Sequence, residues 1–304
     1  ALYKYLACSG KIAKEAVDSV EELKQLHHCK APASYGGGGT YRGVTYTFTD
    51  ADCGGPRSWS STSCVIGIKE ARQSGEDEDF RAYVNPPRMK WWMNSAAAST
   101  NLAADYLCPA SNSRLTSDFS FFRCKSTRAY SGATTKSHTF TSAECGGKLP
   151  PFNGRDCLAV FGQRSQSGRD KQWEVLRYEQ ATTIKWQCPG CSANINAEVH
   201  YVCPKLRHRD QSPWKIYKCY KFFWDAGQNT ISYTWKAEDC GGHLPPPTAN
   251  CFSGHRGGFY QGRNEDMRVF SPKDARGFSF EWWCSGPCTG TAHILADYIC
   301  FEDS

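Results

Sequence analysis

The 304-residue chain carries a formal net charge of +6, and 40% of its residues are hydrophobic, which is enough for a folded core. Its 17 cysteines far exceed ordinary usage and argue against a protein from a reducing compartment, so we expect a secreted, extracellular protein with disulfide bonds. No apolar stretch approaches the length of a membrane span, which argues against a transmembrane helix.

The first predicted element is an amphipathic helix over residues 10–28, most of which lies in an N-terminal helical segment placed at 1–25. Ile12 and Val20 belong to an apolar stripe with helical spacing, and charged residues occupy the other face. Cys8 precedes this helix and stands outside the repeated cysteine pattern. It makes the cysteine total odd, so its bonding state stays open.

The rest of the chain consists of three copies of one pattern, centred on Cys-Gly-Gly turns at Cys53, Cys145 and Cys240. An aromatic, strand-like run precedes each turn, and each copy closes on a tyrosine two positions before its last cysteine. This self-similarity, with a period of about 85 to 95 residues, predicts three tandem units. The predicted units are 26–110, 119–205 and 214–304.

Short strands separated by turns rich in glycine and proline, with few helical stretches, predict a β-dominated α+β fold. Each unit is small, so we expect disulfides to stabilise it. The expected architecture is three tandem, disulfide-stapled small domains preceded by the N-terminal helix. Polar segments at 111–118 and 206–213 are the predicted linkers, and we expect the units to fold independently.

Two cysteines of each later unit are missing together from the first unit, where Met93 stands in place of one of them. A pair lost together is most simply a bonded pair. The expected local bridges are Cys188–Cys191 and Cys284–Cys288. The alternative in the second unit is a structural zinc site, which would need a further ligand, and His200 is the candidate.

Four cysteines are common to all three units, and four cysteines allow three connectivities. We favour a first-to-last bridge that closes each unit, with an inner bridge after the Cys-Gly-Gly turn. The expected outer bridges are Cys29–Cys108, Cys124–Cys203 and Cys219–Cys300. The expected inner bridges are Cys53–Cys64, Cys145–Cys157 and Cys240–Cys251.

A tryptophan near the end of each unit leads to the first candidate binding residues. Trp91, Trp186 and Trp282 occupy the same position in the three units, which most simply indicates core residues. The next residue on a strand faces the opposite side, and it is a tryptophan in two units, at Trp92 and Trp283. We predict that these two are exposed contacts for a glycan or a protein. The alternatives are a second small core or a contact between units.

The excess positive charge is confined to the middle unit. Residues 111–205 carry 13 basic and 7 acidic side chains, whereas the two signs balance in the other segments. Two interpretations of this surplus stay open: ordinary surface charge, or an anionic partner such as acidic polysaccharide, phospholipid or nucleic acid. Paired arginines can clamp a carboxylate or phosphate, and two pairs are further candidates: Arg164 with Arg169, and Arg263 with Arg268.

No spacing in the sequence assembles a catalytic site. The best trio for acid–base chemistry is His243, His255 and Glu238, but no spacing requires these residues to meet. The sequence has no Gly-x-Ser-x-Gly nucleophile motif, and nearly every cysteine has a counterpart. We therefore expect a protein that binds rather than catalyses, without a cofactor or a resident metal ion.

Tyrosine-flanked cysteines, an alanine at position 1 and small disulfide units in tandem give the chain a recognisable general form. In that form it resembles the cysteine-rich tandem-repeat secreted effector proteins of plant-associated fungi. The resemblance implies a virulence-type effector that engages a glycan or a host protein, including carbohydrate binding. Although the positive surplus of the middle unit would suit nucleic acid, nucleic acid is not among the expected partners. The alternatives are an antimicrobial or membrane-active toxin, and a secreted hydrolase or ribonuclease.

Overall fold

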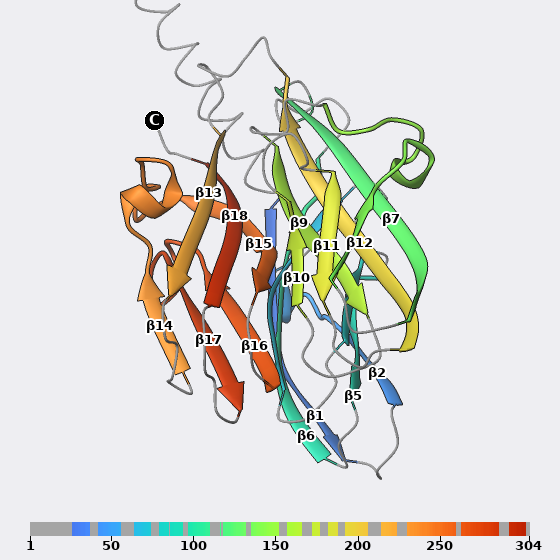
Figure 1. Cartoon of the computed structure of the whole chain (residues 1–304). Coiled ribbons are helices and arrows are strands. Elements are labelled where there is room, and N and C mark those ends of the chain that lie inside the picture. Colours follow the sequence, from blue (N-terminus) through green and yellow to red (C-terminus); the bar gives the residue numbers. More distant parts are fainter. Residues whose placement is uncertain are drawn as a thin grey trace, which may run out of the picture.

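In the computed structural model, the described part of the chain is built almost entirely of β-strands (Figure 1). It describes residues 26–36, 42–55, 64–73, 79–84, 86–93, 97–109, 116, 118–131, 135–151, 157–165, 172–176, 182–187, 192–205, 214–223, 230–259, 263–285 and 292–301. The α+β prediction was therefore wrong. Residues 26–28, at the end of the predicted N-terminal helix, begin a strand, and the rest of that helix prediction lies outside the described residues.

Each repeat supplies six strands in the same order. The first repeat contains β1 (Leu26–Gly36), β2 (Arg42–Thr47), β3 (Val65–Gln73), β4 (Asp79–Tyr83), β5 (Arg88–Met93) and β6 (Ala97–Leu107). The second contains β7 (Phe119–Ser131), β8 (Lys136–Thr139), β9 (Leu158–Ser165), β10 (Gln172–Val175), β11 (Thr183–Gln187) and β12 (Ser192–Pro204). The third contains β13 (Trp214–Phe223), β14 (Thr230–Thr234), β15 (Asn250–Phe259), β16 (Arg263–Phe270), β17 (Ser279–Ser285) and β18 (Ala292–Phe301).

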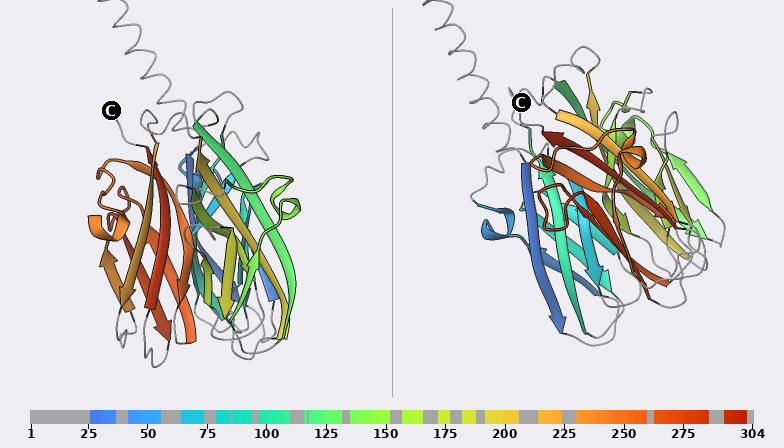
Figure 2. Two further views of the ribbon diagram at one scale, coloured as in Figure 1. Left: turned by 45° about the horizontal axis from the view of Figure 1, so that its top comes forward. Right: turned by 90° about the vertical axis from the view of Figure 1, so that its left-hand side faces the viewer.

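The three repeats share their sheets. Sheet A has the order β1-β6-β3-β16-β17-β14, sheet B has β2-β5-β4-β9-β12-β7, and sheet C has β13-β18-β15-β10-β11-β8. Each sheet therefore joins the first, sixth and third strands of one repeat to the fourth, fifth and second strands of another, and the pattern is cyclic. Figure 2 shows the first (blue to cyan), second (green to yellow) and third (orange to red) repeats side by side. The prediction of three separate small domains was wrong, because antiparallel pairing continues across every repeat boundary.

Hydrophobic cores lie within each repeat and also between the repeats. Trp91, Trp186 and Trp282 are buried in the three repeat cores, which confirms the prediction for these positions. A fourth apolar cluster lies where the repeats meet and takes equivalent residues from all three: Val65, Leu158 and Phe252, with Leu107, Val202 and Ile299. Burying one such side chain contributes about 1.5–3 kcal/mol, so this fourth cluster ties the repeats into one body.

The predicted connectivity of the shared cysteines was wrong. The structure joins the first to the second and the third to the fourth in every repeat: Cys29–Cys53, Cys64–Cys108, Cys124–Cys145, Cys157–Cys203, Cys219–Cys240 and Cys251–Cys300. The cause is strand pairing. Because Val65 pairs with Leu107 in the β3–β6 ladder, the adjoining cysteines are brought together. The predicted local bridges at Cys188–Cys191 and Cys284–Cys288, and the state of Cys8, lie outside what the structure describes.

Each Cys-Gly-Gly turn is a single turn of 3-10 helix: η1 (Ala51–Cys53), η2 (Ala143–Cys145) and η4 (Ala237–Cys240). The glycine that follows has a positive φ of 80°, 76° or 87°, a conformation that a residue without a Cβ adopts at little cost, which explains why glycine recurs after the cysteine. The carboxylate one residue before the cysteine accepts a backbone N–H from three residues earlier. These contacts are Asp52 with Thr49 (2.7 Å), Glu144 with Thr141 (2.8 Å) and Asp239 with Lys236 (2.9 Å). No helix within the described ranges is long and apolar enough to cross a membrane.

Candidate functional site

Three buried polar side chains join the repeats at their meeting point. The position immediately before the closing tyrosine holds Asp105, His200 and Asp297, and all three are fully buried. Each accepts a hydrogen bond from a backbone N–H of another repeat. The donors occupy equivalent positions: Ser253 to Asp105 (2.9 Å), Ile66 to His200 (2.6 Å) and Ala159 to Asp297 (3.0 Å). The hydrogen bonds therefore follow the same cyclic pattern as the sheets.

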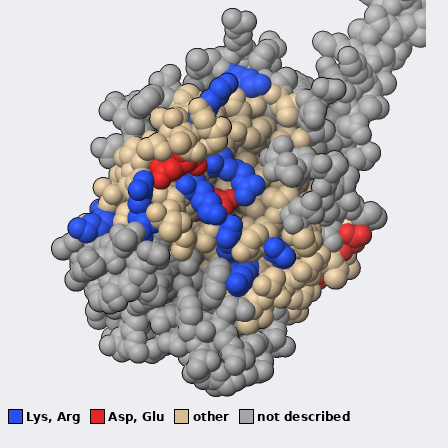
Figure 3. Space-filling view, turned by 90° about the vertical axis from the view of Figure 1, so that its right-hand side faces the viewer, with Lys and Arg blue, Asp and Glu red and all other residues tan. Residues whose placement is uncertain are grey.

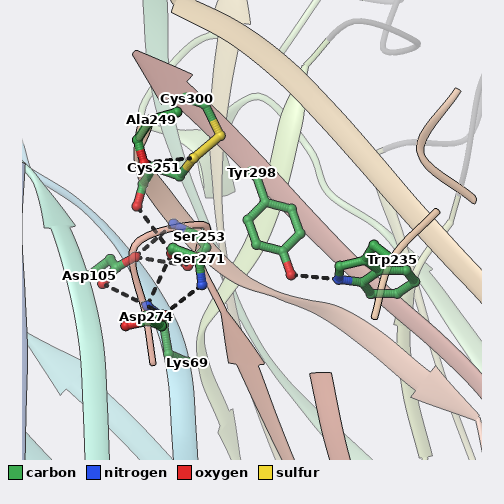
Figure 4. The surroundings of a disulfide bond; sticks show 10 residues. All are labelled: Lys69, Asp105, Trp235, Ala249, Cys251, Ser253, Ser271, Asp274, Tyr298 and Cys300. Atoms are coloured by element: carbon green, nitrogen blue, oxygen red, sulfur yellow. Dashed lines mark hydrogen bonds and ion pairs between the residues drawn. A yellow bond between two sulfur atoms is a disulfide. The ribbon is translucent and has the colours of Figure 1, made fainter. Parts of the chain in front are cut away.

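Charged neighbours complete this ring of buried groups. The hydroxyl of Ser253 also donates to Asp105 at 2.8 Å, and the ammonium of Lys69 donates to Asp274 at 2.8 Å (Figure 4). Arg256 lies 3.0 Å from Asp297. Charged side chains that are removed from water need a partner of opposite charge or a hydrogen bond. The charged side chains of this ring have such contacts within the protein. We therefore assign the ring to holding the repeats together, not to ligand binding.

His200 uses both ring nitrogens within the protein. Its Nδ1 accepts the N–H of Ile66, so Nε2 carries the ring proton and donates to Glu198 at 2.8 Å. Burial lowers the pKa of His200, which keeps the ring neutral. Burial alone would raise the pKa of Glu198, but His200 and Arg123 lower it well below its usual range. His200 is therefore not free to bind zinc, while the two cysteines of that alternative lie outside the described residues.

The candidate site lies on the face of sheet B that is turned away from the repeat cores, which we call face B. Cross-strand neighbours form one row across all six strands: Thr45, Lys90, Arg81, Gln163, Glu198 and Lys125. Side chains directly opposite each other on antiparallel strands share a face. The alternating residues, such as Phe80 and Trp91, fill the core. The row is exposed at both ends and buried in the middle, where the first and second repeats join.

Two guanidinium groups lie over one tyrosine ring beside this row. The central carbons of Arg81 and Arg88 are 4.5 and 4.6 Å from the ring centroid of Tyr83. The Nε atoms of both arginines are buried and have no hydrogen-bond partner within the described part of the chain. The same is true of Oε1 of Gln163, a residue that is 4% exposed. Buried polar atoms without a hydrogen bond also occur elsewhere in the described residues, but these three belong to neighbouring residues of one face, where a ligand or water would complete them.

Face B is basic. Arg123 and Lys125 are exposed on β7, and three further basic residues lie on β4 and β5. Glu198 is the acidic member of the row, and it is already paired with Arg123 at 2.6 Å. Figure 3 views the side on which β7 and β12 lie in Figure 1, and there Lys and Arg side chains gather around few acidic ones. An anionic ligand would therefore meet donors that are only partly neutralised.

Sheets A and C carry different side chains at the equivalent positions. The pair Arg81 and Lys90 corresponds to Arg268 and Glu281 on sheet A, and to Glu174 and Lys185 on sheet C. On sheet A, the acid also forms an ion pair with Arg276. Each of those two pairs balances one acid against one base, whereas the pair on face B is doubly basic. Two basic residues at this pair of positions therefore occur on face B and not on the other two sheets, so the fold does not require them.

The structure settles the position of one predicted binding residue in full. Arg268 lies on β16 at the junction of sheet A, with its guanidinium 4.3 Å from the ring centroid of Phe270. The other predicted residues have side chains outside the described part: Trp92 on β5, Trp283 on β17, Arg164 on β9, Arg263 on β16, and Arg169, whose backbone also lies outside it. Their role in binding stays a prediction.

Sequence reasoning missed the central residues of face B: Arg81, Tyr83, Arg88 and Lys90. A local signal for them exists, because basic or aromatic residues alternate with apolar ones along β4 and β5. Counting charge by segment hid them, since the first unit has no net surplus. The pairing of β4 with β9, which sets them beside the basic second repeat, has no local signal.

The trio considered for catalysis is not brought into one accessible site. Glu238 and His243 are exposed around η4, whereas His255 is buried in β15. A general acid or base must reach its substrate, so a trio divided between surface and interior does not provide a shared site.

No known protein family, curated protein sequence or solved structure matches the chain. The described residues define its class: a β-sheet protein with disulfide bonds, whose three repeats share their sheets in a cyclic pattern and which carries a basic face on sheet B. Its function is argued below from the geometry of that face.

Proposed function

We propose that the protein is a secreted binding protein that holds an acidic polysaccharide on face B. The observation that carries the proposal is the pair Arg81 and Arg88 over the ring of Tyr83, with both Nε atoms unpaired. Guanidinium groups match the geometry of carboxylate and sulfate groups. The disulfides support a secreted location, because they persist in oxidising compartments.

The unpaired atoms favour a glycan over a simple anion. The arginine Nε groups need acceptors, whereas Oε1 of Gln163 needs a donor. A sugar acid supplies both, because its carboxylate accepts hydrogen bonds and its hydroxyl groups donate them. An inorganic sulfate supplies acceptors alone.

The extent of the row favours a polymer. Neighbouring strands lie about 4.8 Å apart, so the row from Thr45 to Lys125 spans roughly 24 Å across six strands. Its basic residues come from two repeats, with Lys90 and Arg81 on one side of the β4–β9 junction and Lys125 on the other. An extended acidic chain can contact all of them at once, which a single small anion cannot do.

The test replaces face B residues with their counterparts on sheet C. Arg81→Glu with Arg88→Thr installs the residue types of Glu174 and Thr183, which the fold already accepts there. We expect the variant to fold and to bind polygalacturonate at least 100-fold more weakly, since each lost charged hydrogen bond costs about 1.5–3 kcal/mol. The measurement is the Kd for polygalacturonate at two salt concentrations, because screening should weaken wild-type binding.

A matched control lowers the net charge equally elsewhere. Lys236→Thr with Lys273→Glu changes two exposed lysines of the third repeat, and Thr141 already stands at the position equivalent to Lys236. We expect this variant to bind as the wild type does. Equal losses in both variants would mean that net charge alone governs binding, and unchanged binding by the face B variant would refute the site. Binding to anionic vesicles in place of polygalacturonate would favour the membrane-active alternative.

A further inference from the structure

Sheet C carries a cluster of partly exposed aromatic rings on the face that is turned away from the repeat cores. Tyr220 and Phe222 lie on β13, and His293 lies beside them on β18. The Tyr220 hydroxyl and Nδ1 of His293 are 2.9 Å apart, and the centroids of the Phe222 and His293 rings are 4.5 Å apart. We call these three residues the aromatic platform.

The equivalent positions in the other repeats are not aromatic. They hold Lys125, Thr127 and Asn196 in the second repeat, and Lys30, Pro32 and Asn101 in the first. The strand pairing is the same in all three, because Phe222 faces His293 as Thr127 faces Asn196. The fold therefore does not require rings at these positions. Partly exposed aromatic side chains that folding does not need are typical of binding sites.

Two charged groups of opposite sign act on His293, the histidine of the platform. Glu174 on β10 and Lys185 on β11 are the charged groups that act on His293, one raising and the other lowering its pKa. Burial is the largest effect and lowers the pKa of His293 below its ordinary value, so its ring is neutral at neutral pH. The His293 ring is thus neutral, and the two charges that act on it are opposite in sign, in contrast to the basic face B.

We infer that the aromatic platform is a second carbohydrate site, which stacks an uncharged sugar ring. A pyranose presents a face of C–H groups that packs against aromatic rings, while its hydroxyl groups form hydrogen bonds at its rim. Glu174 and Lys185 lie further along the same sheet, on β10 and β11, where they supply an acceptor and a donor for the hydroxyl groups of an adjoining sugar unit. An uncharged ligand suits a site with a neutral histidine and two opposite charges, whereas an acidic ligand would gain nothing from it. The inference rests on different residues and a different sheet from the proposed function.

The test gives the platform the residues of the second repeat. Tyr220→Lys, Phe222→Thr and His293→Asn together reproduce the residue types of Lys125, Thr127 and Asn196, so we expect the wild-type unfolding temperature. The probes are three uncharged glycans: laminarin, chitohexaose and galactomannan. We expect the wild type to bind at least one of them, the triple variant to bind it at least about tenfold more weakly, and the face B variant to bind it as the wild type does.

A second variant covers a failure of the triple variant to fold. Phe222→Thr alone removes one ring and leaves the Tyr220–His293 contact in place, and it should also weaken binding of the same glycan. The triple variant should retain polygalacturonate binding, which separates this site from face B. The inference is overturned if the wild type binds none of the three glycans, or if Phe222→Thr and the folded triple variant bind as tightly as the wild type.

Discussion

At the scale of single residues, the meeting point of the repeats is defined by steric limits. A Cβ atom on Gly67 would lie 2.1 Å from the carbonyl oxygen of Ser253 in the third repeat. The equivalent residue in the second repeat is Val160, and in the third it is Gly254. A Cβ on Gly254 would lie 3.0 Å from that valine. The point where the three repeats meet therefore has room for one side chain larger than glycine, that of Val160, among its three equivalent positions.

Gly67→Ala should be strongly destabilising. The new Cβ would meet a backbone carbonyl held in the neighbouring repeat, and that carbonyl cannot rotate away as a side chain can. We expect a loss of at least about 3 kcal/mol in the free energy of unfolding, or failure to fold. The matched variant Val160→Ala removes volume at the equivalent position and should cost about 2 kcal/mol. Equal stability of Gly67→Ala and the wild type by denaturant titration would show that the repeats are not packed this closely.

At the scale of elements, the Cys-Gly-Gly turn is a repeated unit held by its carboxylate. In the second repeat, Glu144 also pairs with His138 at 3.0 Å and accepts from Ser126 at 2.8 Å. Burial alone would raise the pKa of this carboxyl, but the N–H of Thr141, the hydroxyl of Ser126 and the ring of His138 together lower it to about 2. The ring that contacts this carboxylate is a tyrosine in two repeats and a histidine in the second, whereas a carboxylate is present in all three. The carboxylate is therefore the component that the turn requires.

The lowered pKa of Glu144 predicts a defined loss of stability in acid. A carboxyl with a lower pKa in the folded state stabilises the protein fully above its unfolded pKa of about 4.5, and this contribution is lost as pH falls towards about 2. Glu144→Gln removes the charge, so the variant should be less stable than the wild type at pH 7. Its stability should also fall less between pH 5 and pH 2.5. Urea denaturation across this range measures both effects.

The control for that experiment is Glu238→Gln, which changes an exposed carboxylate one residue before Asp239 in η4. This variant should follow the wild-type pH profile. If Glu144→Gln follows that profile as well, the carboxylate of the second-repeat turn does not contribute to acid stability.

At the scale of the whole molecule, the shared sheets make the repeats interdependent. The second repeat alone would leave β9 without its neighbour β4, and β10 without its neighbour β15. It would also expose its part of the fourth apolar cluster, including Leu158 and Val202. The two proposed binding faces lie on one such body and keep their relative positions, so a polymer with acidic and uncharged segments would engage both with a gain in avidity.

The protein should therefore unfold as a single cooperative unit. We expect one calorimetric transition whose van't Hoff and calorimetric enthalpies agree. A protease site engineered into 206–213 should allow cleavage there without separating the fragments in non-denaturing gel filtration, and the segment 119–205 expressed alone should not fold. Separate transitions, or a folded second repeat released by cleavage, would instead support the independent units predicted from the sequence.

The sequence by itself determined the features with a local or periodic signature. The recurrence of cysteine, glycine and tyrosine defined three repeats, and a shared position identified Trp91, Trp186 and Trp282 as core residues. Glycine after the turn cysteine was predictable because only a residue without a Cβ adopts positive φ at little cost.

Only the tertiary structure decided which strands pair between repeats, and through them the disulfide partners and face B. Antiparallel pairing is formed by backbone groups that every residue carries, so an exchange of strands between repeats leaves no mark in any one of them. Cys64 and Cys108 meet because β3 lies beside β6, and Arg81 meets Gln163 because β4 lies beside β9. If each repeat had formed its own separate domain, β4 would not pair with β9. Arg81 and Arg88 of the first repeat would then lie far from β7, the basic strand of the second repeat.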